Sequence, residues 1–136
     1  GVGFHRHNSE IEQMIKKYTK KKFRFTFTPH LLPMFKGILT TIYVDLDKTK
    51  TIYSLYNELN KFYKKAKFIK ITKMNSLIST NDVINTNNCR ISICKTKYKD
   101  KAVILSSIDN LIKGGAGQAV QNLNIIKGFN VKDGFK

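Results

Sequence analysis

The stretch CRISICKTKYKDKAVILSSI, residues 89–108, decides the fold class because it contains two strand-like segments around a short polar turn. The residues of CRISICKTK (89–97) alternate as in a strand, and AVILSSI (102–108) is rich in β-branched and aliphatic residues, which favour strands. The turn KYKD separates them by so few residues that we expect an antiparallel pair. A β-hairpin is therefore predicted.

Upstream of this hairpin, helix and strand patterns alternate. Ser9 and Glu12 have capping-box spacing, and apolar residues then recur at helical intervals, which predicts a helix from about Ser9 to Lys20. FRFTFT (23–28) alternates phenylalanine with polar residues, as a strand with one buried face does. After the proline-containing loop PHLLPMFKG, a second strand is predicted for ILTTIYVDL (38–46).

The remaining segments complete an α+β pattern. We predict an amphipathic helix from Thr51 to about Lys65, a short strand KFIKIT, a long polar surface loop from Lys73 to Asn88, and a last helix from roughly Asn110 to Ile126. These elements predict a mixed, largely antiparallel sheet with helices on one face. We expect the other face, to which ILTTIYVDL contributes few charges, to be an interface.

Composition narrows the class of protein further. The 136 residues are one domain's worth of chain, and 41% hydrophobic residues predict a packed core. No apolar run has the length of a membrane span or of a signal peptide, so we expect a cytoplasmic protein without a membrane partner. Cys89 and Cys94 are an odd number of residues apart on one predicted strand and would point to opposite faces, so we expect no disulfide.

The charge has two interpretations. With 25 Lys+Arg against 9 Asp+Glu the formal charge is +16, which suggests a nucleic-acid-binding module. Lysine accounts for nearly all of it, since Arg6, Arg24 and Arg90 are the only arginines, and arginine is the residue that recognises phosphate and guanine by two hydrogen bonds. We therefore expect a solvated lysine surface and no nucleic-acid partner.

The densest group of chemical side chains is His5-Arg6-His7, just before the first predicted helix. Imidazole exchanges protons near neutral pH, and a guanidinium binds carboxylate or phosphate by two hydrogen bonds. The same residues also suit an ordinary polar surface turn. With His30 and the two cysteines scattered along the chain, no metal-ligand spacing is present.

Four small residues, GGAG at 114–117, occupy the start of the last predicted helix. They lack the G-x-x-x-x-G-K-[ST] pattern of a phosphate loop, and Lys113 precedes them. Glycine costs a helix about 1 kcal/mol relative to alanine. We therefore expect another element to pack closely against these turns.

Three blocks of the chain resemble, in order and spacing, the C-terminal domain of N-acetyl-gamma-glutamyl-phosphate reductases: GVGFHRHNSEIEQ (1–13), FTPHLLPMFKGILTTIYV (27–44) and SSIDNLIKGGAGQAVQNLNIIKGF (106–129). The stretch from about Ile71 to Asn88 resembles the family least. The family itself is similar to aspartate-semialdehyde and glyceraldehyde-phosphate dehydrogenases. The resemblance implies an α+β catalytic and dimerisation domain that follows an NADP-binding Rossmann domain.

The resemblance also implies a reaction. Enzymes of this family reduce N-acetyl-gamma-glutamyl phosphate to the semialdehyde in arginine biosynthesis, through a thioester on a cysteine. His5 falls at the family's catalytic histidine, which activates that cysteine and handles protons. Arg6 and His7 would line the substrate pocket. Lys36 falls where the family usually has arginine, and lysine keeps the charge without the two-pronged grip.

The family pattern places Asn110, Gly114 and Gly115 near the cofactor, at the helix that returns to the Rossmann domain. Two of its motifs are missing, since neither Cys89 nor Cys94 lies in a P-G-C-[FY]-x-T motif and no G-x-G-x-x-G follows a strand. We therefore expect residues 1–136 to be one C-terminal domain that is inactive alone, with its partners being the acyl phosphate and further copies of itself. The nucleic-acid-binding module and a purely structural dimerisation domain remain the alternative hypotheses.

Overall fold

The computed structural model describes residues 3–20 and 23–135 of the chain. The chain forms two compact units, Gly1–Met34 and Phe35–Lys136, which we call the N-terminal unit and the sheet unit. Each unit is described by itself.

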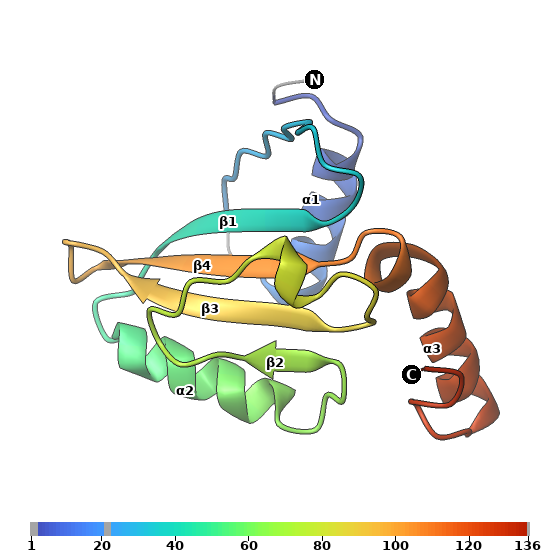
Figure 1. Cartoon of the computed structure of the whole chain (residues 1–136). Coiled ribbons are helices and arrows are strands. Elements are labelled where there is room, and N and C mark those ends of the chain that lie inside the picture. Colours follow the sequence, from blue (N-terminus) through green and yellow to red (C-terminus); the bar gives the residue numbers. More distant parts are fainter. Residues whose placement is uncertain (1–2, 21–22, 136) are drawn as a thin grey trace. The chain divides into compact units, whose positions relative to one another are not determined.

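The sheet unit contains four strands in the order β1-β4-β3-β2 (Figure 1). Strand β4 pairs antiparallel with both β1 and β3, whereas β2 pairs parallel with β3. The strands are β1 (Ile38–Asp45), β2 (Ile69–Ile71), β3 (Cys89–Lys95) and β4 (Lys101–Ile108). The predicted α+β class with a mixed, largely antiparallel sheet is confirmed.

The hairpin that dominates the sequence forms the two central strands. Within it Ile93 faces Ile104 and Cys89 faces Ile108, and Ile93 is fully buried. Both cysteines lie on β3 as predicted and are free thiols. The strands predicted from the β-branched segments are all present, because each has a neighbour with which its backbone can pair.

Helix α2, Ile52–Tyr63, covers β2 and β3 on one face of the sheet. It begins as predicted at Thr51, whose hydroxyl accepts the Ser54 backbone N–H while the Ser54 hydroxyl accepts that of Thr51. Lys95 of β3 reaches Tyr53 of this helix, and side chains two residues apart on a strand share a face. Ile93 is therefore buried beneath α2.

The opposite face carries serines that bind the segment 73–88. The Ser92 hydroxyl donates to the Ser76 carbonyl at 2.6 Å, and the Ser107 hydroxyl donates to the Ser79 carbonyl at 3.0 Å. Both serines are fully buried. The predicted surface loop therefore covers β3 and β4 and is held there by side-chain hydrogen bonds. The composition of the loop alone does not predict these bonds.

This cover corrects the expectation of one open sheet face. The segment buries Ile78 and Val83 and includes a short 3-10 helix, η1 (Thr80–Asp82). The exposed apolar surface lies instead on β1, which pairs on one side with β4 and is an edge of the sheet. Its large exposed side chains are Ile38, Leu39, Ile42 and Tyr43.

The last helix starts later than predicted. Residues Ile112–Ala116 form a π-helical turn, η2, with Gly115 outside helical geometry, and α3 runs from Gly117 to Lys127. Figure 1 shows α3 beyond the end of the sheet, continuing from β4. The glycines lower helical propensity at the predicted start, so the first turns are irregular. A left-handed Gly128 ends α3.

In the N-terminal unit, helix α1 spans His7–Tyr18. The predicted capping box is wrong, since the helix begins two residues before Ser9 and the Ser9 hydroxyl donates to the Arg6 carbonyl at 2.9 Å. The predicted strand 23–28 is also wrong, because these residues form no strand ladder. Its alternating rings pack on one another and on the histidines, which an extended chain can do without a partner strand.

The carboxylate of Asp109 connects several parts of the sheet unit just after β4. Its side chain is fully buried, and its oxygens accept the backbone N–H groups of Asn85 at 2.8 Å, Leu111 at 2.9 Å and Ile112 at 3.1 Å. Burial raises the pKa of Asp109, but these hydrogen bonds and the nearby Lys36 ammonium outweigh it and hold the pKa below its ordinary value. The charged form is therefore the one that the fold stabilises.

We predict that Gly117→Ala lowers the free energy of unfolding by about 2 kcal/mol, as overpacking does. An added Cβ would lie 2.5 Å from Asn87 Oδ1, 2.6 Å from Ile112 Cγ2 and 2.8 Å from the Ile112 carbonyl oxygen. Gly114→Ala is the matched control, because its nearest contact would be an ordinary 3.5 Å. Urea denaturation measures both, and equal stabilities of the two variants would contradict the prediction.

A second prediction concerns Asp109→Asn, which we expect to lower the free energy of unfolding at pH 7 by about 3 kcal/mol, the order of magnitude for lost charge-assisted hydrogen bonds in a buried site. Because the folded pKa is lowered, the contribution is present above the unfolded pKa of about 4 and disappears as the pH falls through the folded value. Denaturation from pH 7 to 3 should show a smaller decline for the variant. Exposed Asp45→Asn is the control, and a variant as pH-sensitive as the parent would refute the assignment.

Candidate functional site

His5 is held in a small group of rings in the N-terminal unit. Its Nδ1 accepts the backbone N–H of His7 at 3.3 Å, and its ring lies 4.6 Å from the His7 ring and 5.5 Å from the Phe27 ring, measured between centroids. An Nδ1 that accepts carries no proton, so the neutral ring has its proton on Nε2. His5 is half-buried, so its ring is partly exposed to solvent.

Arg6 and His7 follow His5 in the sequence, and the His7 ring packs on the His5 ring. Arg6 is exposed at the start of α1, and its guanidinium has no hydrogen-bond or ion-pair partner among the described residues. His7 Nε2 lies 4.0 Å from Glu10 Oε2, at the outer limit of an ion pair. The guanidinium of Arg6 is thus free to bind an anionic group by two hydrogen bonds.

Lys36 lies in the sheet unit and is anchored by two side chains. Its Nζ donates to Asn85 Oδ1 and lies 4.0 Å from Asp109 Oδ2. The lysine side chain is 23% exposed, against 0% for Asp109. Its charge is therefore partly compensated before any ligand arrives. An ammonium has three donors, and the one hydrogen bond to Asn85 leaves two of them.

Asn110 fastens the loop that carries Lys36. The Asn110 Oδ1 accepts the backbone N–H of Gly37 at 2.7 Å. Gly37 has a φ of +108°, and an added Cβ there would lie 2.7 Å from the Thr80 Cβ, so glycine is required. The Nδ2 of Asn110 has no partner among the described residues and remains a donor for a ligand.

The three small residues of η2 that the sequence singles out are exposed. Gly114, Gly115 and Ala116 leave the backbone of this turn open, while Gly117 after them is buried against Asn87. The close packing predicted for this stretch is thus an internal contact at Gly117. Gly114 lies near the Ile108 side chain, 3.5 Å from where a Cβ would be, whereas a Cβ at Gly115 would meet only the Asn110 carbonyl oxygen at 3.4 Å.

Lys113 and Gln121 lie beside this turn. Lys113 Nζ donates to Gln121 Oε1 at 2.8 Å and lies 5.4 Å from the Phe68 ring centroid, and burial lowers its pKa. Asn87 Nδ2 donates to the same oxygen at 3.0 Å, and its own Oδ1 is buried without a partner among the described residues. These residues support the helix start.

Residues 3–20 and 23–135 contain no group of three or more histidine, cysteine, aspartate or glutamate side chains able to hold a metal ion. None of the helices in this part of the chain is long and apolar enough to cross a membrane.

The predicted site residues therefore fall into two clusters. His5, Arg6 and His7 are together in the N-terminal unit, and Lys36 and Asn110 are joined through Gly37 in the sheet unit. Sequence reasoning missed Asp109 and Asn85, which hold Lys36. An aspartate directly after the buried strand AVILSSI and before a helical segment was the available signal, since this is the place of a helix-capping carboxylate.

Comparison with known proteins assigns the chain to a family. The family model "Semialdehyde dehydrogenase, dimerisation domain" matches residues 1–110. The chain is 44% identical over 136 residues to the N-acetyl-gamma-glutamyl-phosphate reductase of Clostridium beijerinckii, 41% over 133 residues to that of Clostridium botulinum and 40% over 135 residues to that of Staphylococcus aureus.

The alignments cover 98–99% of this chain and 39% of each relative, so the chain spans about two fifths of the length of the curated relatives it matches. The relatives named are reductases, and the family model that matches this chain is described as a dimerisation domain. With most of its length matched by that family model, the chain belongs to the semialdehyde dehydrogenase dimerisation-domain family.

Proposed function

We propose that the chain is the C-terminal catalytic and dimerisation domain of an NADP-dependent reductase that converts N-acetyl-gamma-glutamyl phosphate into N-acetylglutamate semialdehyde and phosphate in arginine biosynthesis. The observation that carries the proposal is about 40% identity to reductases of that name along 98% of the chain. This span includes His5, Arg6 and His7, which we call the HRH cluster. The nucleophilic cysteine and the Rossmann domain belong, in this proposal, to a further segment of the enzyme. The domain alone is then inactive.

His5 is the proposed catalytic residue. Its Nδ1 accepts the His7 N–H, which leaves Nε2 as the nitrogen that can pass a proton to a developing oxyanion or stabilise a thiolate. The Phe27 ring limits how the imidazole can turn. Proton handling at Nε2 during thioester formation and reduction is the role that this geometry supports.

Substrate binding is assigned to Arg6, His7 and Lys36. The unpaired guanidinium of Arg6 suits the two-pronged recognition of a carboxylate or phosphate, and His7 adds a donor beside it. Lys36 is the weaker anion binder of the three because Asp109 already compensates part of its charge. Its role is to present its remaining N–H groups to the substrate.

For the cofactor, the residues present in this chain fit a minor role. Asn110 has a free Nδ2, and Gly114 and Gly115 expose backbone without side chains, which allows close approach of a nucleotide or of the domain that carries it. When bound, NADPH supplies the hydride of the reduction. These three residues would contact it from the side of the sheet unit.

The homo-oligomer is assigned to strand β1. Leu39 and Tyr43 project from one face of this edge strand and are 48% and 81% exposed, an apolar surface that a second copy would cover. Tyrosine of this kind is typical of interface centres. Ile42 lies on the other face of the strand.

To test the catalytic assignment, His5→Asn is introduced into the complete enzyme, where we expect turnover to fall by a factor of about 10² to 10⁴, the range for a positioned general acid or base. His30→Asn, in an exposed segment of the same unit, is the matched control and should retain activity. Steady-state kinetics and thermal unfolding separate loss of chemistry from loss of fold. Full activity of the His5 variant would overturn the role of His5.

The interface is tested by the pair Tyr43→Arg and Ile42→Arg. We expect Tyr43→Arg to dissociate the oligomer because it places an unpaired charge in a dry interface, whereas Ile42→Arg, on the opposite face, leaves the assembly intact. Sedimentation velocity of both variants measures this. Dissociation by Ile42→Arg alone would place the interface on the other face, contrary to the proposal.

A further inference from the structure

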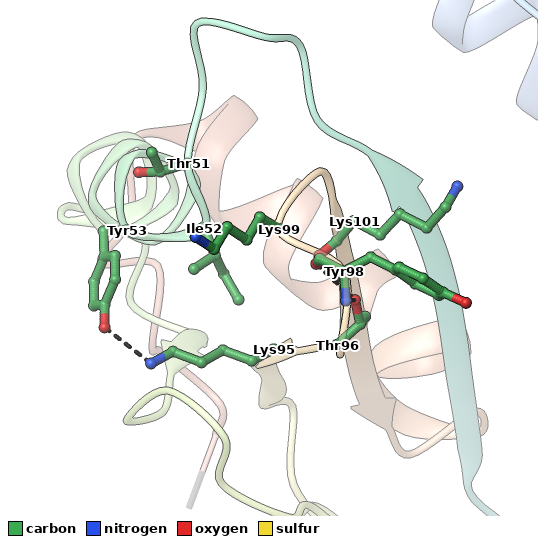
Figure 2. A pocket seen from close by; sticks show the side chains of 8 residues that line it. All are labelled: Thr51, Ile52, Tyr53, Lys95, Thr96, Tyr98, Lys99 and Lys101. Carbon is green, nitrogen blue, oxygen red and sulfur yellow. Dashed lines mark hydrogen bonds between the residues drawn. The ribbon is translucent and has the colours of Figure 1, made fainter.

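A cavity lies between the first turn of α2 and the β3–β4 hairpin, apart from every residue assigned above. Its volume is about 350 Å³, within the size range of small-molecule sites. Figure 2 shows Ile52 of α2 and Lys95 of the hairpin lining it from opposite sides, with Lys99 reaching toward the start of α2. The lining residues are Thr51, Ile52, Tyr53, Lys95, Thr96, Tyr98, Lys99 and Lys101.

The lining contains three lysines and no acidic residue. Lys101 is neutralised by an ion pair with Asp45. Lys95 instead donates to the Tyr53 hydroxyl at 2.9 Å and lies 5.0 Å from the centroid of that ring, while Lys99 forms no ion pair within the described residues. Two positive charges therefore face one cavity without a carboxylate to balance them.

The helix beside the cavity adds to this positive potential. The Thr51 and Ser54 hydroxyls each accept the backbone N–H of the other residue. The N–H groups of Ile52 and Tyr53 belong to the first turn of α2, where helical N–H groups lack an intrahelical acceptor. Both of these residues line the cavity. An anion placed there would meet two ammonium groups and the positive end of α2.

We propose that this cavity binds a small organic phosphate, with the phosphate between Lys95 and Lys99 and the organic part against Ile52 and the Tyr53 ring. Lysine with helical N–H groups is a combination that suits phosphate, whereas planar recognition of a carboxylate would call for arginine, which the lining lacks. The half-buried Ile52 and the lysine stems give the cavity an apolar wall. The proposal does not depend on the reductase activity proposed above.

The test is titration of the ¹⁵N-labelled chain with phenyl phosphate, followed by NMR of the backbone amides. We expect saturable shifts at Tyr53, Thr96 and Lys99, with weaker binding of inorganic phosphate at the same amides and none of benzyl alcohol. Lys99→Gln should weaken phenyl phosphate about tenfold, the loss expected for one charge-assisted hydrogen bond. Lys70→Gln, an exposed lysine of β2 outside the cavity, is the matched control and should bind as the parent does.

Several results would overturn the proposal. Shifts that spread over the surface without saturation would indicate non-specific attraction to a +16 chain. Equal weakening by Lys70→Gln and Lys99→Gln would show the same. Benzyl alcohol binding as tightly as phenyl phosphate would make the site apolar, and shifts confined to Gly37 and Asn110 would place the phosphate at the Lys36 loop. Unchanged spectra of the Lys99 variant outside the hairpin confirm that it is folded.

Discussion

The buried carboxylate of Asp109 is the interaction on which the arrangement of the sheet unit depends. It lies directly after the central strand β4 and accepts backbone N–H groups from the 73–88 segment and from the first turn of η2. Without these donors the fully buried carboxylate would lack hydrogen-bond partners, which costs more than the hydrogen bonds themselves contribute. The same carboxylate attracts Lys36, so the loop before β1 is positioned by the residue that also starts the last helical segment.

Polar groups of this kind explain why the two faces of the sheet differ. Helix α2 covers one face through apolar contacts around Ile93, whereas the other is closed by the hydroxyls of Ser92 and Ser107 on loop carbonyls. Each serine hydroxyl donates a hydrogen bond to a carbonyl of the irregular 73–88 segment, which forms no strand of its own. Strand β1 lies outside both covers, and the exposed apolar surface of the sheet is therefore at that edge.

The chemistry of the proposed reductase divides between the two units in a consistent way. Proton exchange and the unpaired guanidinium belong to the N-terminal unit, where few contacts restrain His5 beyond His7 and Phe27. The sheet unit supplies Lys36 and Asn110, which are held by hydrogen bonds and carry little free charge. Two such groups of residues are compatible with a site completed by another part of the enzyme.

The sequence by itself determined the strands of the sheet, the hairpin and helix α2, because their periodicity and the cap at Thr51 are local properties. It also determined the HRH cluster and the family, since three blocks in order are a pattern of sequence alone. The strand predicted from the alternating phenylalanines at 23–28 is absent. Such alternation indicates an extended chain with one apolar side, but it does not indicate that a partner strand is present.

Tertiary structure decided where the buried polar groups lie. The role of the 73–88 segment as a cover, the requirement for glycine at 117 and the grip of Asp109 and Asn85 on Lys36 all join residues distant along the chain. Such contacts have no period and no local signature, since they depend on which backbone groups remain unpaired after the sheet has formed. Packing decides which backbone groups remain unpaired, and the sequence supplies the side chains that can form hydrogen bonds with them.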